Sequence, residues 1–243
     1  MNKILVNNIE KNNIDSKYIL DHDDNIYLEL DNINKELFLV VKENVNITFN
    51  IFGKCSDLKL NVSISENSNL IINTLILEGK FNISINMEGK NSTVYSNYSV
   101  VSSENSHNKI EVKHLVSNTN SYLSNHGFSL NKADIILDVN GCIPKESSKC
   151  VSHQDNQIIE IEDSLSQINP NLYIENYDVE ASHAAYIGEF KEEALFYMMS
   201  RGISMDDAKF LLLKAFLLGN FKFDDTTYDN YMNGVTKYFN REV

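Results

Sequence analysis

Residues 170–188 read PNLYIENYDVEASHAAYIG, and this stretch separates two parts of the chain that have different sequence patterns. Before it, short apolar segments alternate with polar turns, which is typical of β-strands. After Gly188, apolar residues recur at the three- and four-residue spacing of an amphipathic helix. The sequence therefore predicts a β-rich body over residues 1–188 and a small C-terminal helical subdomain over residues 189–243.

The body repeats one theme from about Asn25 to Val139. Two architectures fit many short strands without helices, namely a sandwich or barrel and a β-helix. Asn46, Asn61 and Asn82 each lie inside a strand between aliphatic residues, as stacked coils allow, but the pattern alone leaves both architectures open. The predicted strands are rich in Val, Ile, Phe and Tyr and cover residues 26–30, 37–41, 45–51, 58–64, 70–77, 81–87, 93–101, 110–116 and 133–139.

The tail contains three predicted helices. The first spans residues 191–201 and has acidic residues in its first turn, which suits the helix dipole. Ser204 begins the second helix as a cap, with Asp207 three residues further on. Residues 208–218 are nearly all apolar, so we expect this helix to be buried on most sides, in its own domain or by a partner. The third helix spans residues 226–239 and has an apolar stripe made of Tyr228, Tyr231, Met232, Val235 and Phe239.

Charge and composition argue against several functions. The net charge of −13 does not suit a nucleic-acid partner, which needs excess Lys and Arg. No apolar run is long enough for a membrane span and the first residues do not form a signal peptide, so we expect a cytoplasmic protein without a membrane partner. Cys55, Cys142 and Cys150 form no CxxC pair, which predicts free thiols. The sequence has no Walker A motif, so the chain is not itself an ATPase.

Residues 170–188 resemble the end of the β-helix in the SufB/SufD family, where a P-x-L-x-I strand leads into the pattern DV-x-x-x-H-x-A-x-x-G. Residues 193–204, EALFYMMSRGIS, are similar to the family pattern E-x-L-F-Y-L-x-S-R-G-[IL]-S, and residues 208–218 are similar to the helix that follows. Residues 143–145 and 153–156 resemble the family more loosely. The resemblance implies a right-handed β-helix followed by a helical subdomain, in a compact SufD-like member.

The resemblance also implies a function. The chain would be a scaffold subunit, and not an enzyme, in a complex that assembles a transient iron–sulfur cluster. Its body would pair with a second copy or with a SufB-like chain near residues 157–175, and its tail would dock on a SufC-type ABC ATPase. Two alternatives stay open: a regulator or stabiliser of a SufC-like ATPase that binds no cluster, and a carbohydrate-active β-helix enzyme, for which no carboxylate pair stands out.

His183 is the residue that carries over most directly, and the resemblance implies a role in cluster assembly as an iron ligand. Imidazole binds iron and relays protons, although a histidine here could equally hold the turn by hydrogen bonding. SufB-type chains have a glutamate where this chain has Ala184, and their cysteine position falls near Asp155 or Asn156. These differences make the chain SufD-like, so a SufB-like partner would supply the missing ligands. Cys150 could bind iron or sulfur as a thiolate, although a lone cysteine is more often a small buried apolar residue.

The tail should also provide the surface that binds the ATPase. Aromatic, Met and Arg side chains carry binding energy at protein interfaces. The tail could instead close the open end of the β-helix, or one face could close the end while another docks. The residues that we expect to bind the partner are Phe196, Tyr197, Met198, Met199, Arg201, Leu212 and Phe216.

Overall fold

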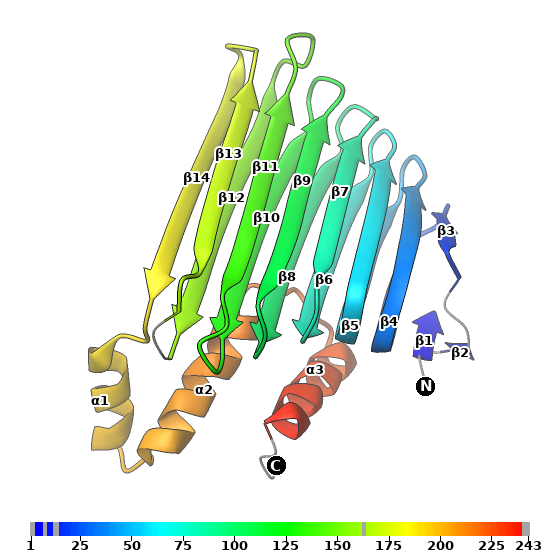
Figure 1. The fold of residues 1–243 in the computed structure, drawn as a ribbon. Helices are drawn as coiled ribbons and strands as arrows, with labels where there is room; N and C mark the ends of the chain where they lie inside the picture. The colour runs from blue at the N-terminus through cyan, green and yellow to red at the C-terminus, as the bar shows by residue number, and fades with distance from the viewer. Residues whose placement is uncertain (1–2, 7–8, 12–14, 162–163, 240–243) are drawn as a thin grey trace.

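The computed structural model describes residues 3–6, 9–11, 15–161 and 164–239 (Figure 1). The chain winds into a parallel β-solenoid of about six turns, followed by three helices, so the predicted β-helix is confirmed and a sandwich is excluded. The strands are β1 (Lys3–Val6), β2 (Ile9–Lys11), β3 (Lys17–Leu20), β4 (Asp24–Val41), β5 (Asn46–Ile64), β6 (Asn69–Leu77), β7 (Phe81–Met87), β8 (Thr93–Ser102), β9 (Ser106–His114), β10 (Asn120–Ser129), β11 (Ile135–Ile143), β12 (Cys150–Glu160), β13 (Gln167–Ile174) and β14 (Val179–Gly188). The helices are α1 (Glu192–Ser200), α2 (Met205–Leu218) and α3 (Asp225–Tyr238).

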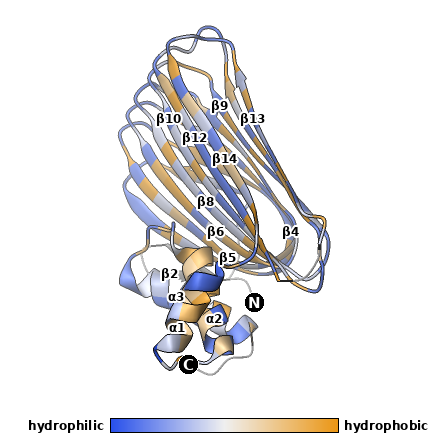
Figure 2. Cartoon of the chain, turned by 90° about the vertical axis from the view of Figure 1, so that its left-hand side faces the viewer, coloured by the Kyte–Doolittle hydropathy of each residue, from blue (hydrophilic) through white to orange (hydrophobic). Residues whose placement is uncertain are grey.

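Successive turns of the solenoid build two facing layers of parallel strands (Figure 2). One layer runs β13-β11-β9-β7 and the other runs β6-β8-β10-β12-β14, and β5 joins them because its first half pairs with β6 and its second half with β7. Long β4 and β5 each combine two of the predicted strands. In each of these strands the backbone turns a corner of the solenoid, at Asn32 in β4 and at Gly53 in β5, where φ is 49° and 133°.

One corner of the solenoid explains the high asparagine content. Asn44, Asn67, Asn91 and Asn118 all have left-handed φ, between 55° and 61°. Asparagine tolerates this conformation better than most residues. The N–H of Asn44 donates to the carbonyl of Glu66 one coil later, and the other three asparagines make the equivalent bond. The asparagines therefore mark the repeat of the coil, although no simple sequence repeat shows it.

Asparagine side chains also form ladders inside the strands. Asn73 donates to Asn50 and Asn97 donates to Asn73, both at 2.9 Å. The strand asparagines singled out from the sequence do not stack on one another. Asn46 accepts from Asn69 in the next coil, whereas Asn61 donates to the carboxylate of Glu36.

The interior of the solenoid changes character along its axis. In the first coils it is filled by fully buried Leu, Ile, Val and Phe side chains, each of which contributes about 1.5–3 kcal/mol by burial. From β9 onwards, where Asn108 and His114 are fully buried, polar side chains enter the interior. On β10 and β12 the buried polar residues of the interior include Ser121, Asn125, Ser152, Gln154 and Asn156. The C-terminal end of the interior is therefore the polar end.

The helices pack against the side of one layer, on β5, β8 and β10 (Figure 1). Leu213, Leu217 and Val235 join a second hydrophobic cluster with body residues such as Phe52 and Phe128. The hydroxyl of the fully buried Tyr231 in α3 donates to the Ile51 and Asn73 carbonyls at 2.8 and 2.9 Å. Helix and body are thus held by one shared core.

The structure bears on two predictions for the helices, namely the cap of α2 and the buried faces of α2 and α3. Ser204 Oγ accepts the Asp207 N–H at 3.1 Å, which confirms the cap of α2. Within this chain, only Ala208, Leu213, Leu217 and Leu218 of α2 are buried and Leu211 is exposed, so burial of α2 on most sides would need a partner. In the α3 stripe Tyr231 and Val235 are buried, but Tyr228 is exposed.

The tail does not close the end of the solenoid. Its helices contact the middle strands, whereas Tyr173 on β13 and Tyr186 on β14 stay exposed on the last coil. None of the three helices has the length and apolar character needed to cross a bilayer, within the described residues.

Candidate functional site

The pairing of β12 with β14 brings the candidate residues of the last coil together. His183 lies beside Gln154, and Ala184 lies beside Asp155 in the same register. The resemblance places the SufB-type cysteine near Asp155 or Asn156, and of these Asp155 is the direct cross-strand neighbour of Ala184. None of Asp155, Asn156 and Ala184 carries a thiol.

His183 lies on an exposed part of β14, and alternation along the strand places it on the same face as Ala181 and Ala185. Its neighbour Gln154 is buried in the interior, so this face looks into the open C-terminal end of the solenoid. The imidazole is thus available both to solvent and to a chain that covers the last coil.

A second histidine lies on the outer face of the same strands. His153 Nδ1 is 2.7 Å from Ser182 Oγ, and His153 Nε2 is 3.3 Å from Glu180 Oε1. The His153 ring continues a stack of Tyr95 and Tyr122, whose centroids are 4.9 Å apart. The resemblance included His153 only loosely. The stacking of its ring could not be predicted, because it depends on the register of β8, β10 and β12.

An open cleft of about 490 Å³ lies over this part of the sheet. It is bordered by His153, Asp155 and His183 on the strands, and by Lys222 from the α2–α3 connection. Lys222 Nζ lies 3.6 Å from the centroid of the Tyr95 ring. Within the described residues, no three His, Cys, Asp or Glu side chains converge closely enough to hold a metal ion. A cluster bound here would need ligands from another chain.

Cys150 lies away from this cleft, buried at a corner of the solenoid. Its Sγ is 3.3 Å from Thr119 Oγ1 and 3.5 Å from the Val116 carbonyl. Thr119 and Ser92 make similar bonds to turn carbonyls in the preceding coils. Cys150 therefore continues a column of small hydrogen-bonding residues at this corner.

The other two cysteines are also reduced. Burial raises the pKa of the Cys55 thiol to about 12, and its Sγ donates to the Lys80 carbonyl. Burial also raises the pKa of Cys142. Both thiols therefore stay protonated at neutral pH, which makes them poor nucleophiles and metal ligands.

The expected partner-binding residues divide into two groups. Phe196, Tyr197 and Met199 on α1 are exposed, with Phe196 at 75%, and no residue of α1 is buried. The guanidinium of the exposed Arg201 lies over the Tyr197 ring. Met198 and Leu212 are half-buried.

Phe216 belongs to the second group, because it faces the body. Its ring stacks on His126 with a centroid distance of 4.5 Å, and its carbonyl accepts from His126 Nδ1 at 2.6 Å. This residue therefore fixes α2 to the body.

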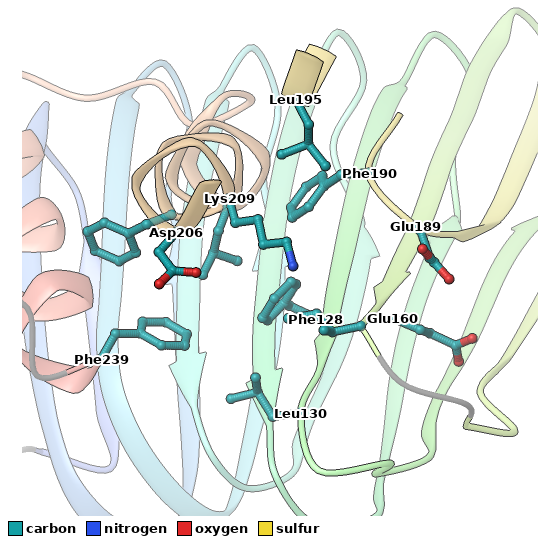
Figure 3. A pocket seen from close by; sticks show the side chains of 12 residues that line it. Phe128, Leu130, Glu160, Glu189, Phe190, Leu195, Asp206, Lys209 and Phe239 are labelled. Atoms are coloured by element: carbon teal, nitrogen blue, oxygen red, sulfur yellow. The ribbon is translucent and has the colours of Figure 1, made fainter. Parts of the chain in front are cut away.

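A cavity of about 330 Å³ lies between the helices and the sheet, next to the half-buried Leu195 of α1 (Figure 3). Phe128, Phe190 and Phe239 line it, and the Lys209 side chain extends toward Phe128 and Phe190. Sequence reasoning did not find this cavity, because it depends on how α2 packs against β10.

The fold and the cleft define a β-solenoid with a side-packed helical tail and a histidine at its open end. Residues 55–216 match the family model described as SUF system FeS cluster assembly, SufBD core domain. The chain belongs to this SufB/SufD family.

Curated relatives agree with this assignment. The iron–sulfur cluster assembly protein SufD of Bacillus subtilis is 32% identical over 108 residues, which are 44% of this chain and 25% of that protein. Iron–sulfur cluster assembly SufBD family proteins of Archaeoglobus fulgidus and Pyrococcus horikoshii are 41% and 37% identical over 56 and 78 residues. These matches cover 23% and 32% of this chain, and 15% and 18% of those proteins. The chain thus matches a quarter or less of each relative's length.

Proposed function

We propose that this chain is a SufD-like scaffold subunit in a SUF-type complex that assembles iron–sulfur clusters. In this proposal it acts in the cytoplasm and carries no catalytic residue of its own. The observation that carries the proposal is the position of His183, which lies on the uncovered last coil beside Gln154 and Asp155. There an imidazole can bind iron at an interface without reaching through the protein.

The partner for the last coil would be a SufB-like chain or a second copy. Among the described strands, β13 and β14 end the two layers, so each leaves one edge of backbone groups without a strand partner. Exposed Tyr173 and Tyr186 lie on these strands. A second chain that added its own edge would pair these backbone groups and cover the tyrosines.

The cluster is the cargo of this complex. His183 would contribute one nitrogen ligand to it, while Ala184 and Asp155 provide no sulfur ligand. Iron–sulfur clusters are held mainly by cysteine thiolates, so those ligands would come from the partner.

The SufC-type ATPase would dock on α1 and the adjoining part of α2. Exposed Phe196, Tyr197 and Met199 form an apolar surface there, and α1 has no buried residue that would fix it in place. Exposed apolar surface of this kind usually marks an interface.

The test is an association measurement with the cognate ATPase. We expect Met199→Asp to weaken binding about 30-fold, because a hot-spot residue contributes about 2 kcal/mol or more. Leu115→Asp is the matched control, since Leu115 is about as exposed but lies in a turn away from the helices. Equal binding by both variants would contradict the docking surface. Deleting the tail is a poorer test, because it would uncover the shared core around Tyr231.

A second function remains supported by one observation. Among the residues that the structure describes, no thiol borders the cleft at His183, and Cys150 is buried elsewhere. A chain of this kind could stabilise or regulate a SufC-like ATPase without binding a cluster. Replacing His183 by Ala separates the two functions: the scaffold loses cluster assembly, whereas the regulator keeps its effect on ATP hydrolysis.

A further inference from the structure

We infer that Gln154 is a positioning residue for His183, and that its side-chain oxygen accepts an N–H from the His183 imidazole. The inference rests on the proposed function, because it concerns how His183 presents its other nitrogen to iron. Metal-binding histidines generally donate their second N–H to an oxygen acceptor, which fixes the tautomer and the ring orientation.

The first observation is the orientation of the Gln154 amide. Its Nε2 donates to the Asn171 carbonyl at 3.2 Å. A carbonyl oxygen only accepts, so the nitrogen must lie on this side and Oε1 must lie on the other. The amide therefore cannot be turned around without losing this bond.

The second observation is that Oε1 lacks a donor. Gln154 is only 3% exposed, and within the described residues no donor lies within hydrogen-bond distance of its Oε1. A buried acceptor left in this state costs roughly 1–3 kcal/mol. Such a cost is unusual in a folded protein, and it is commonly found where a group has a functional task.

The third observation is the place of the amide in the solenoid. Gln154 belongs to β12, but its Nε2 reaches Asn171 on β13 in the last coil. Its neighbours in register are Leu123 on β10 and His183 on β14. Leu123 has no donor, so the imidazole is the side chain in this row that can satisfy Oε1.

In this proposal the His183 side chain rotates to make the missing bond. His183 and Gln154 are paired in register, so their side chains leave the sheet on the same face about 5 Å apart. Once the ring nitrogen that faces Gln154 carries the proton, the other nitrogen is unprotonated and available to iron. His153, Asp155 and Lys222 border the same cleft, but Asp155 and His153 alternate to the outer face.

The experiment compares Gln154→Met with Gln154→Glu in the full chain. Both substitutions remove the bond to Asn171, and only Glu keeps an oxygen acceptor toward His183. The readout is the tautomer ratio of the His183 ring, measured from its ¹⁵N chemical shifts. We expect one tautomer to exceed the other at least roughly fivefold in wild type and in Gln154→Glu, as a net bond of about 1 kcal/mol requires.

In Gln154→Met we expect that preference to be lost, and cluster assembly with the cognate partners to slow about tenfold. Asn125→Leu is the matched control, because Asn125 Oδ1 is also a buried acceptor without a donor in the described part of the chain. Asn125 lies on β10, two strands from β14, and it is in register with Ala185 and not with His183. A tautomer ratio that does not change in Gln154→Met overturns the inference. If instead His183→Ala assembles clusters at the wild-type rate, the proposed function fails while the tautomer result stands.

Discussion

His114 is a buried imidazole inside the solenoid, with both ring nitrogens hydrogen-bonded. Nδ1 is 2.7 Å from Thr119 Oγ1, and Nε2 is 2.9 Å from Ser121 Oγ. Burial lowers the pKa of His114 from 6.5 to about 4, although the contact with Thr119 acts in the opposite direction. Burial also lowers the pKa of His126, beneath α2. Both rings are therefore neutral in the folded protein at neutral pH.

These histidines predict a loss of stability on mild acidification. A lowered folded pKa means that the unfolded chain takes up the proton first, so the stabilisation is present above about pH 6.5 and is lost as the pH falls. For His114 the loss between pH 7 and pH 5 is about 2 kcal/mol. Urea unfolding at both pH values checks this. His114→Gln should lose about that much less than wild type on acidification, and equal losses would contradict the prediction.

At the residue scale, the sequence predicted His183 as a candidate site residue but did not predict its surroundings. The pairing of Asp155 with Ala184 depends on the register of β12 and β14. The coils differ in length, since Asn46 bonds to a residue 23 positions later and Ser121 to one 31 positions later. No constant spacing therefore relates one strand to the next, so the neighbours of His183 could not be predicted.

Among the elements, the helices were the most predictable. The third helix, predicted over residues 226–239, is observed as α3 (Asp225–Tyr238). Caps and apolar spacing are local signals, and they define such an element without knowledge of the rest of the fold. The long strands β4 and β5 were predicted as four separate pieces, because the corners at Asn32 and Gly53 are polar or glycine but remain within continuous strands.

The cap of α2 provides a test at this scale. Ser204→Ala removes the acceptor for the Asp207 N–H, which should destabilise the protein by about 1 kcal/mol. Ser200→Ala is the control, since Ser200 Oγ bonds only to the Tyr197 carbonyl at the end of α1. Chemical unfolding of both variants measures the difference. A Ser204 variant as stable as the Ser200 variant would show that the cap does not hold the helix.

At the scale of the whole molecule, the interior of the solenoid is apolar in the first coils and more polar toward the last coil, and the helices cover one side. The proposed pairing through the last coil predicts that Tyr173→Asp on β13 weakens association with a second copy or a SufB-like chain, because the new charge would be desolvated. Sedimentation should show a shift toward the monomer at micromolar concentration.

Tyr228→Asp is the control for this prediction. Tyr228 is similarly exposed, but it lies on α3, away from the last coil. Both changes are on the surface and should leave the free energy of unfolding nearly unchanged. If the Tyr228 variant dissociates and the Tyr173 variant does not, the partner binds elsewhere.

The side-packed tail has a mechanical consequence. In a solenoid each coil contacts mainly its neighbours, so coils can detach from an end one after another. Here α2 and α3 bridge β5, β8 and β10, and Tyr231 bonds to the carbonyls of Ile51 and Asn73 in two successive coils. A pull on the N-terminal end would meet this bridge as soon as it reaches β4, because Tyr27 also packs on Tyr231, and from there several coils must detach together.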